Sequence, residues 1–306
     1  MLPAPLDTAL DRTIALGYSR IGYALRAAAW RDCAPPGDAL RGRVVAITGP
    51  TSGIGRAAAQ GAQALGATVL LIGRNADRTH ALRYELGGDT QVELADMSLL
   101  SSVRDLAARL RGRALHALVH NAGVMTEHRT QTAEGNEVTL ATHVLGPHLL
   151  SRLLLDAPPA RTVWVSSGGM YTQRLDAADL QSSAGAFNGT TAYARTKRMQ
   201  VVLAQEWARR TPSPAVVHAM HPGWVDTPGL TEGLKTFHRL TGPILRSPAQ
   251  GADTIVWLAA ADAPARSSGR FWHDRRERPT HYLARTREQA SDREALWAAC
   301  ERLTAD

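Results

Sequence analysis

The stretch Thr48-Gly49-Pro50-Thr51-Ser52-Gly53-Ile54-Gly55 decides the fold. It joins the apolar run Val44–Thr48, typical of a buried strand, to Gly55–Leu65, whose spacing is typical of a helix. One glycine can form the tight turn, a second lets the backbone approach a pyrophosphate, and a third lets the helix pack on the sheet. The first N–H groups of such a helix favour phosphate. The stretch therefore predicts a dinucleotide site formed by Thr48, Gly49, Ser52, Gly53, Ile54 and Gly55.

Short apolar runs alternate with helical patterns along the rest of the chain. The predicted strands are Val44–Thr48, Thr68–Gly73, Gln91–Leu94, Leu115–His120, Thr162–Ser166 and Ala215–His221. The predicted helices are Gly55–Leu65, Ala76–Leu86, Ser101–Arg111, Ala133–Leu155 and Tyr193–Arg210. This alternation predicts an α/β fold: a single doubly wound domain whose parallel sheet is covered by helices on both faces.

Length and composition set the limits of the interpretation. The chain has 306 residues, of which 44% are hydrophobic and 21% charged, which suits one globular domain at 42–306 behind an extension at 1–41. Its two cysteines exclude a disulfide scaffold and a cysteine zinc site. Neither a membrane-spanning run nor a signal peptide is recognisable, so we expect a cytoplasmic protein. The net charge of +7 is spread along the chain, and we expect no nucleic-acid partner.

The extension carries an amphipathic helical pattern. Leu10, Ile14, Tyr18, Ile21 and Leu25 recur at spacings of four and three, and arginines lie off this stripe. We expect a helix that packs on its own domain or on a partner subunit. The alternative is weak contact with a membrane surface through residues 6–31. A linker that contains Pro35, Pro36 and Gly37 follows.

The end of the second predicted strand bears on the choice of dinucleotide. Gly73 and Arg74 offer no carboxylate for a ribose 2′-hydroxyl, whereas the Arg74 guanidinium can bind a 2′-phosphate. We therefore expect NADP(H) to be preferred over NAD(H), with Asn75 beside Arg74 in the site. Asp96 can accept a hydrogen bond from the adenine amino group, or it can cap the next helix. Its neighbour Met97 completes this part of the predicted site.

Tyr193 and Lys197 stand four residues apart, on one face of a predicted helix. A phenol has an ordinary pKa of about 10, and a nearby ammonium favours the phenolate. Only two of the 35 basic residues are lysines, Lys197 and Lys235, so a lysine at this position is informative. Ser166 and Ser167 end the fifth predicted strand, at the sheet edge where ligands bind. Together these residues indicate acid–base chemistry on a carbonyl or an alcohol.

In this combination the sequence resembles the short-chain dehydrogenase/reductase family. The matching motifs are Thr48-Gly49-x-x-x-Gly53-x-Gly55, His120-Asn121-Ala122-Gly123, Ser166-Ser167, Tyr193-x-x-x-Lys197 and Pro222-Gly223-Trp224-Val225-Asp226-Thr227, over about residues 42 to 275. The stretches Ser166–Tyr171, Tyr193–Arg198 and His221–Trp224 resemble the subgroup called SDR family member 12.

The resemblance implies roles for individual residues. Ser167 is the expected catalytic serine, Tyr193 the acid–base and Lys197 its partner, which also binds the nicotinamide ribose. Asn121, Ala122 and Gly123 are expected beside the adenosine ribose. Pro222, Gly223, Val225 and Thr227 are expected to hold the nicotinamide amide and a phosphate. The resemblance further implies a homo-oligomer.

One residue departs from the family pattern. His143 stands where the family normally carries an asparagine that holds a water and relays protons to the lysine. Histidine can also bind a water and can change its charge near neutral pH, so His143 is a candidate catalytic residue. The alternatives are a packed histidine, a slow enzyme, or a nucleotide-binding sensor or scaffold that has lost turnover.

Three further segments complete the prediction. Residues 168–191 carry Met170, Tyr171, Leu175, Leu180 and Phe187 and are expected to form part of a substrate wall. Residues 228–246 are expected to form a lid, whose Leu230, Leu234, Phe237 and Leu240 favour an apolar small-molecule carbonyl or alcohol. The basic cluster of Arg275, Arg276 and Arg278 in the tail is expected to be a solvated face.

Other chemistries lack their sequence patterns. The 11 histidines show no zinc-binding spacing, so we expect no metal. The chain has neither a G-x-x-x-x-G-K-[ST] phosphate loop nor a G-x-S-x-G nucleophile elbow. We therefore expect an NADP-dependent oxidoreductase rather than an ATPase or a hydrolase.

Overall fold

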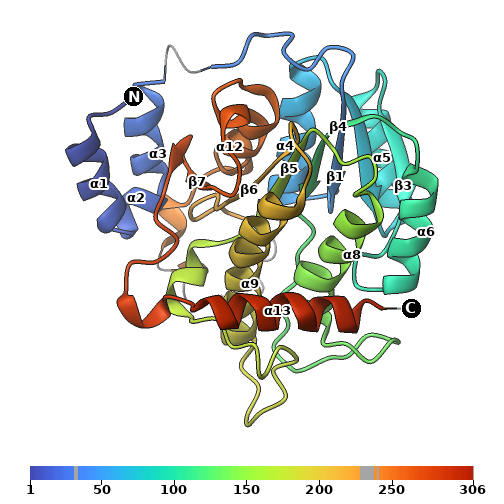
Figure 1. Cartoon of the computed structure of the whole chain (residues 1–306). Helices are drawn as coiled ribbons and strands as arrows, with labels where there is room; N and C mark the ends of the chain where they lie inside the picture. Colours follow the sequence, from blue (N-terminus) through green and yellow to red (C-terminus); the bar gives the residue numbers. More distant parts are fainter. Residues whose placement is uncertain (31–33, 228–237, 240, 306) are drawn as a thin grey trace.

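The computed structural model describes residues 1–30, 34–227, 238–239 and 241–305. They form an eight-stranded sheet in the order β3-β2-β1-β4-β5-β6-β7-β8 (Figure 1). All neighbouring strands are parallel except the last pair, β7 and β8. The strands are β1 (Val44–Thr48), β2 (Thr68–Gly73), β3 (Gln91–Leu94), β4 (Leu115–His120), β5 (Arg161–Val165), β6 (Val216–Met220), β7 (Phe271–His273) and β8 (Arg276–Glu277).

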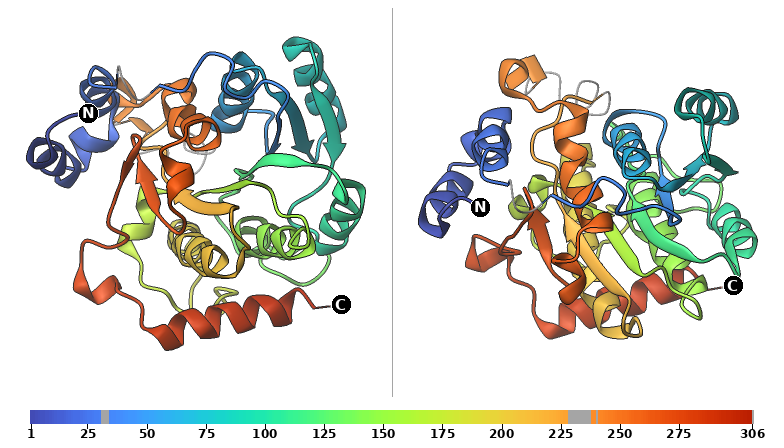
Figure 2. Two further views of the ribbon diagram at one scale, coloured as in Figure 1. Left: turned by 45° about the horizontal axis from the view of Figure 1, so that its top comes forward. Right: turned by 90° about the horizontal axis from the view of Figure 1, so that it is seen from above.

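Helices cover both faces of this sheet (Figures 1 and 2). The α-helices are α1 (Ala4–Arg12), α2 (Ala15–Tyr18), α3 (Arg20–Ala27), α4 (Gly53–Ala64), α5 (Ala76–Leu86), α6 (Leu100–Leu110), α7 (Val138–Leu140), α8 (Gly146–Leu153), α9 (Gly189–Arg210), α12 (Pro248–Ala260) and α13 (Ala290–Leu303). The remaining helical turns are the π-helix η1 (Ala141–Leu145) and the 3₁₀ turns η2 (Gly168–Thr172), η3 (Gly242–Ile244), η4 (Pro264–Arg266) and η5 (Ala284–Thr286).

Two hydrophobic cores lie on opposite faces of the sheet. One contains side chains of α4 and α12, such as Ala59 and Leu258, and the other contains side chains of α6, α8 and α9, such as Leu106, Leu149 and Leu203. Strands β1, β2 and β5 between them are almost fully buried, as expected for parallel strands covered on both sides. The predicted doubly wound α/β architecture is therefore confirmed.

Most predicted boundaries agree with the structure to within two residues, because short apolar runs and helical spacing are local signals. The exceptions are α9, which begins four residues before Tyr193, and the helix predicted at Ala133–Leu155. That helix begins only at Val138, after the Glu137 side chain accepts the N–H groups of Thr139 and Leu140. Strands β7 and β8 and helices α12 and α13 were not predicted from the sequence. For α12 a signal was present, since Ser247 and Gln250 form a capping box around Pro248.

The N-terminal extension differs from its prediction in two ways. It forms the three short helices α1, α2 and α3 rather than one helix, with a break at Ile14, which has a φ of 49°. Of the predicted apolar stripe only Tyr18 is fully buried, whereas Ile14, Ile21 and Leu25 are exposed. The face that packs on the domain instead carries the buried charged side chains of Asp7, Asp11 and Arg26.

The basic cluster in the tail was predicted to be solvated, and this is wrong. The Arg278 side chain is buried and contacts the Asp7 carboxylate of α1, and Arg276 lies 2.9 Å from the same carboxylate. Arg275 pairs with Asp253 of α12 at 2.6 Å. Arg278 is thus buried and Arg275 and Arg276 are half-buried, because each has an acidic partner on another element of the fold.

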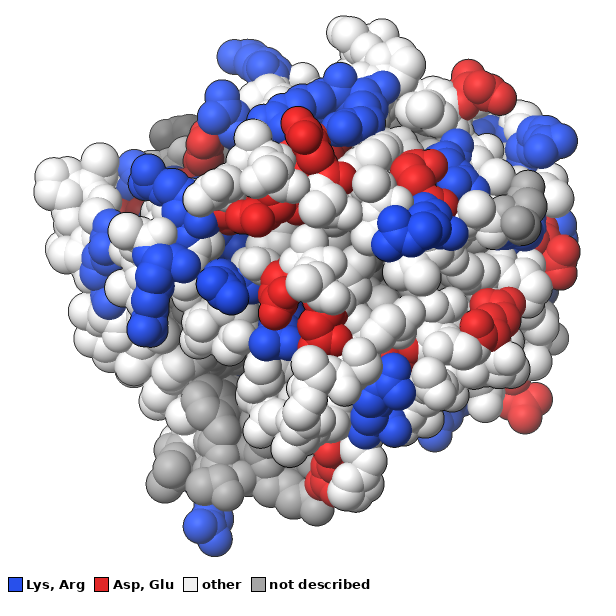
Figure 3. Space-filling view, turned by 60° about the horizontal axis from the view of Figure 1, so that its bottom comes forward, with Lys and Arg blue, Asp and Glu red and all other residues white. Residues whose placement is uncertain are grey.

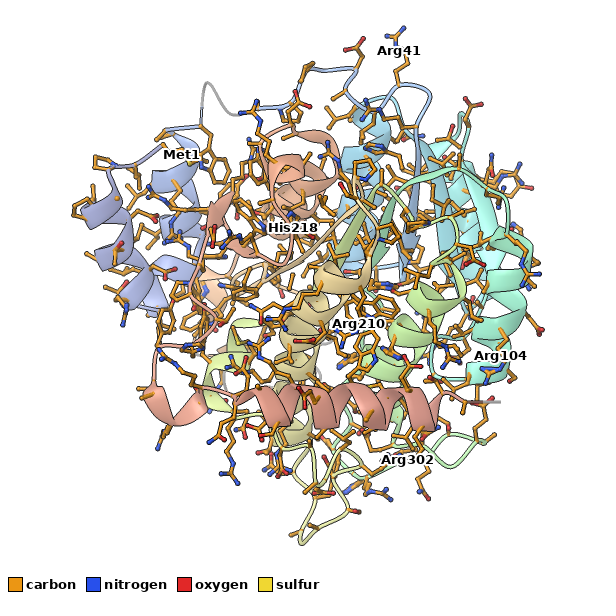
Figure 4. The ribbon with its side chains drawn as sticks, viewed as in Figure 1. Met1, Arg41, Arg104, Arg210, His218 and Arg302 are labelled. Atoms are coloured by element: carbon orange, nitrogen blue, oxygen red, sulfur yellow. The ribbon has the colours of Figure 1, made fainter. Side chains whose placement is uncertain are left out.

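The C-terminal helix α13 crosses the ends of α9 and α8 (Figure 1). Arg210 of α9 stacks on Trp297 of α13, with its guanidinium carbon 3.9 Å from the ring centroid, and Arg104 of α6 donates to the carbonyls of Thr304 and Ala305 (Figure 4). Over the face seen in Figure 3, basic and acidic side chains are interspersed. None of the helices in the described part of the chain combines the length and apolar character that a bilayer crossing requires.

Candidate active site

A cavity of about 620 Å³ lies along the carboxyl ends of the parallel strands. This is the edge at which open α/β sheets bind ligands. Nearly all the residues predicted for the site line it, namely Gly49, Ser52, Gly53, Ile54, Gly55, Arg74, Asn75, Asp96, Met97, Asn121, Ala122, Gly123, Ser167, Tyr193, Lys197, Pro222, Gly223, Val225 and Thr227. Two predicted residues, Thr48 and His143, lie behind the wall rather than in it.

Two positions of the glycine-rich turn are packed too closely against the protein to admit a side chain. Gly49 has a φ of 64°, and a Cβ there would come within 2.8 Å of the Ala122 backbone. A Cβ on Gly55 would lie 2.2 Å from the Gly49 carbonyl oxygen and 2.4 Å from Asn121 Nδ2. Because this turn lines the cavity and precedes the first N–H groups of α4, it fits the pyrophosphate of a dinucleotide.

Thr48 and Asn121 hold this turn against the end of β4. Thr48 Oγ1 accepts the N–H groups of Asn121 and Ala122 at 3.0 Å each. Asn121 Nδ2 donates to the carbonyls of Thr48 and Gly49, also at 3.0 Å. Thr48 therefore shapes the glycine-rich turn without facing the cavity.

Two arginines lie at the end of the cavity that is formed by the turn between β2 and α5. Arg74, which was predicted, and Arg78, which was not, both line it with exposed side chains. Asn75 lies between them and caps α5, because its Oδ1 accepts the Arg78 N–H at 2.9 Å. The signal for Arg78 was its position in the first turn of α5, which begins just after Arg74. Asp96 Oδ1 accepts from the Ser98 N–H and hydroxyl, so this oxygen serves the local turn.

Ser167, Tyr193 and Lys197 meet at the other end. Ser167 follows β5, while Tyr193 and Lys197 lie one turn apart on α9. Lys197 Nζ donates to the Val165 carbonyl at 2.8 Å and lies 5.5 Å from the centroid of the Tyr193 ring. Ser166 differs from its neighbour, because its hydroxyl donates to the Lys197 carbonyl and so ties β5 to α9.

Burial controls the protonation of this group. It raises the pKa of the Tyr193 phenol, and a hydrogen bond with Ser167 partly offsets the rise. It lowers the pKa of the Lys197 ammonium to about 7. From the sequence, the charge of Lys197 was predicted to lower the pKa of Tyr193. In this structure desolvation instead raises the pKa of Tyr193, whose side chain is half-buried beside the buried Lys197.

His143 lies on the π-helix η1 with both ring nitrogens in hydrogen bonds. Nε2 accepts the Val124 N–H at 3.0 Å, which leaves Nδ1 to donate to Thr196 Oγ1 at 2.8 Å. Burial holds the pKa of the ring far below its usual value, so it is neutral. Both nitrogens are occupied, and neither is available for the relay water considered above. The ring instead joins the turn after Asn121 to α9, and its edge faces Tyr193.

The prediction that residues 168–191 form part of a substrate wall is wrong for the five apolar side chains that were named, since none of them lines the cavity. Met170, Tyr171, Leu175 and Leu180 are buried in the hydrophobic core, because this segment covers α9, and Phe187 is half-buried outside the cavity. The lining near Ser167 consists instead of Met125, Gly168, Gly169, Thr172, Gln173, Thr190, Thr191 and Trp224. Apart from Met125 and Trp224 these are small or polar turn residues, which carry no hydrophobic signal in sequence. The predicted lid residues Leu230, Leu234, Phe237 and Leu240 lie outside the described residues.

Metal binding has no visible basis in the described part of the chain, where no three His, Cys, Asp or Glu side chains are grouped as ligands. The cavity is thus lined by the glycine-rich turn, by two arginines at one end and by Ser167, Tyr193 and Lys197 at the other.

Comparisons with known proteins agree with this geometry. The family model for short chain dehydrogenases matches residues 43–236. Dehydrogenase/reductase SDR family member 12 of Bos taurus is 39% identical over 302 residues, 94% of this chain and 93% of that protein. Polyprenol dehydrogenase of Mus musculus is 35% identical, over 86% and 84%. A crystal structure of an uncharacterized protein from Mycobacterium paratuberculosis has a TM-score of 0.71 and 28% identity, over 86% and 94%. The chain belongs to the short-chain dehydrogenase/reductase family of oxidoreductases and resembles its SDR family member 12 subgroup.

Proposed function

We propose that this protein transfers a hydride between NADP(H) and a carbonyl or secondary alcohol, with Ser167, Tyr193 and Lys197 as its catalytic residues. The observation that carries the proposal is that these three side chains line one end of the cavity while Arg74 and Arg78 line the other. A dinucleotide with its pyrophosphate on the glycine-rich turn spans that distance in the family fold.

The side chains divide the work at the reacting oxygen. The Ser167 and Tyr193 hydroxyls hold it by hydrogen bonds, and Tyr193 gives or takes its proton. The nicotinamide, when bound, supplies or accepts the hydride. Lys197 Nζ has donors left beyond its bond to Val165, and these can hold ribose hydroxyls. A charged Lys197 favours the Tyr193 phenolate, which alcohol oxidation requires.

The preference for NADP(H) rests on the two arginines. Both guanidiniums are exposed at the end of the cavity where the adenosine ribose would lie, so they can approach a 2′-phosphate from two directions. No carboxylate of β2 or its following turn competes for the ribose 2′-hydroxyl, since this stretch reads Gly73-Arg74-Asn75.

An apolar substrate remains part of the proposal. Met125, Trp224 and Val225 give the catalytic end of the cavity apolar surface. The related mouse protein is named for polyprenol, an apolar alcohol. We expect long-chain or isoprenoid carbonyls to be reduced faster than short polar ones.

The first test is Tyr193→Phe. We expect turnover of a carbonyl panel with NADPH to fall at least about 10³-fold, in line with loss of a positioned acid. The affinity for NADPH should stay near that of wild type, because the ring remains. Tyr84→Phe, at a side chain that is 81% exposed, is the matched control. Wild-type turnover in Tyr193→Phe would contradict the acid–base role.

A second role is favoured by the outer surface of the N-terminal extension. Leu6, Ile14, Leu16, Ile21 and Leu25 are each between 43% and 57% exposed, although single exposed apolar residues are the usual case. Asp7, Asp11 and Arg26 of the same helices point inward instead, whereas Arg12 and Arg20 are exposed. We propose that this surface lies on a lipid membrane, which would bring the enzyme to an apolar substrate.

Co-sedimentation with phosphatidylcholine vesicles tests this second role. The double variant Leu16→Ser/Leu25→Ser should sediment less than wild type. Leu94→Ser/Leu283→Ser, which changes exposed leucines elsewhere, should sediment like wild type. Equal sedimentation of all three proteins would contradict membrane contact. A change in oligomeric state of the first variant would instead show that the surface joins the subunits of the expected homo-oligomer.

A further inference from the structure

The N-terminal extension contacts the two loops that form the catalytic end of the cavity. We propose that residues 4–30, here called the N-terminal clamp, fix these loops from behind, and that Tyr18 is the positioning residue through which they do so. The inference rests on the proposed function, because it assigns a role in that same site. The family model begins only at residue 43, so the clamp is an addition to the part of the chain that the family model matches.

The Tyr18 ring lies directly behind the loop that carries Ser167. Its side chain is only 2% exposed, and it does not line the cavity. A Cβ on Gly168 would come within 2.7 Å of Tyr18 Cε2, and its three nearest atoms would all belong to the Tyr18 ring. The residue after the catalytic serine is thus in van der Waals contact with a side chain from the extension.

The Tyr18 backbone supports the second loop. Its carbonyl accepts the Trp224 N–H at 2.8 Å, and a Cβ on Gly223 would lie 2.7 Å from the same oxygen. The Tyr18 ring also meets the Trp224 ring edge-on, with centroids 6.3 Å apart. Gly223 and Trp224 both line the cavity. One residue therefore packs against both loops of the catalytic end.

Arg246 joins the clamp to the same loop. Its guanidinium donates to the carbonyls of Gly17 and Ser19 on one side and of Pro222 on the other, at 3.0 to 3.2 Å. Its backbone exchanges hydrogen bonds with Trp224 and Asp226, at 2.7 and 2.9 Å. Because the side chain is 1% exposed, each of these contacts is shielded from water.

Buried ion pairs hold the clamp in place. Arg26 contacts Asp7 at 2.7 Å and Asp274 at 2.6 Å, and Asp274 also contacts Arg246 at 2.6 Å. Arg278 reaches Asp7 from the tail. These charges are almost completely buried, so separating the clamp from the domain would leave them unpaired. The clamp is therefore part of the domain and holds a fixed position.

This arrangement acts on one end of the cavity only. Tyr18 supports Gly168, Gly223 and Trp224, whereas Arg74 and Arg78 stand at the opposite end. Loss of the Tyr18 ring should loosen the catalytic end and leave the adenosine end intact. General destabilisation of the fold would affect both ends alike.

The experiment compares two ligands by calorimetric titration of the full-length protein. NADPH occupies both ends of the cavity, and adenosine 2′,5′-bisphosphate occupies only the adenosine end. For Tyr18→Ala we expect NADPH affinity to fall about ten-fold or more, with kcat for a carbonyl substrate falling on the order of 10²-fold, as misplacement of about 1 Å can cause. Affinity for the bisphosphate should be unchanged.

Tyr18→Phe keeps the ring and should restore NADPH affinity and kcat to wild-type values. Tyr84→Ala, which removes an exposed ring, should match wild type throughout. Unchanged NADPH affinity and kcat in Tyr18→Ala would overturn the inference. Equal weakening of both ligands would overturn it as well, because a structural loss would then explain the result.

Hydrogen exchange without nucleotide separates this inference from the proposed function. Tyr18→Ala should speed exchange in peptides that cover 166–172 and 222–226, with β1 and β4 unchanged. If wild type bound neither ligand, the proposed function would fail while this measurement still decided whether the clamp fixes the loops. Unaltered exchange in both peptides would overturn the clamp.

Discussion

Lys197 is expected to lower the stability of the fold that contains it. Its ammonium is buried, with the Val165 carbonyl as its hydrogen-bond acceptor, and burial lowers its pKa to about 7 from an ordinary value of about 10.4. Between these two values the unfolded chain binds more protons than the folded protein. Above the pKa of Lys197 in the unfolded chain, its burial therefore costs no stability. As the pH falls toward the pKa of Lys197 in the folded protein, the free energy of unfolding decreases, and below that pKa the loss is complete.

The size of this effect follows from the same two pKa values. At about pH 7 the linkage costs the folded protein about 4 kcal/mol, and at about pH 9 it costs about 2 kcal/mol. Lys197→Met keeps the length of the side chain and removes the charge. Allowing about 1 kcal/mol for the lost hydrogen bond, we expect the variant to be about 3 kcal/mol more stable at neutral pH, or about 5 °C in Tm. It should have no oxidoreductase activity.

Urea unfolding of wild type and Lys197→Met, without nucleotide, checks this expectation at several values between about pH 7 and about pH 9. The difference between the two proteins should shrink by about 2 kcal/mol over this range. Taking the difference cancels the contribution of Cys300, whose thiol pKa is raised by burial and which is common to both. Parallel pH profiles, or a variant less stable than wild type at neutral pH, would refute the argument.

Three shorter predictions follow from other parts of the structure. Arg74→Ala/Arg78→Ala should weaken NADPH binding by at least about ten-fold in calorimetry and leave NADH binding unchanged, because each charge-assisted bond to phosphate contributes about 1.5–3 kcal/mol. Asp7→Asn should cost about 3–5 kcal/mol in urea unfolding, since it leaves buried arginines without a countercharge; no change would show that the pairs are solvated. Gly168→Ala should destabilise the protein by about 1–3 kcal/mol, and adding Tyr18→Ala should cost less than the sum of the two single changes. Simple additivity in this cycle would mean that the two residues do not touch in solution.

The sheet and the cofactor turn could be predicted from sequence because their signals are local. Strands β1, β2 and β4 are largely apolar runs, and the glycine-rich turn follows the first of them directly. Tyr193 and Lys197 were recognisable because they lie one helical turn apart. Arg78 was missed, although its place in the first turn of the predicted helix Ala76–Leu86 puts it close to Arg74 at the cavity.

The N-terminal clamp could not be predicted in this way, because hydropathy assigns apolar residues to the inside. Here α1 and α3 bury Asp7, Asp11 and Arg26 and expose leucines and isoleucines. The partners that make this favourable, Asp274 and Arg278, lie about 250 residues further along the chain. A buried charge is stable only when it is paired, and a single sequence does not show which distant residues will pair.

Three deeply buried arginines follow the same rule. The buried cations Arg26, Arg198 and Arg246 all contact carboxylates, and a guanidinium keeps its charge and binds such groups through several donors. Lys197 is buried as deeply, but its hydrogen bond goes to a carbonyl and its pKa falls to about 7. An arginine at this position would remain charged at every relevant pH. A lysine can gain or lose its proton as charge in the cavity changes, and the proposed chemistry of Tyr193 needs a partner of that kind. Lys197, the one lysine in the described part of the chain, therefore stands at a position where an adjustable charge, and not a permanent one, suits the proposed chemistry.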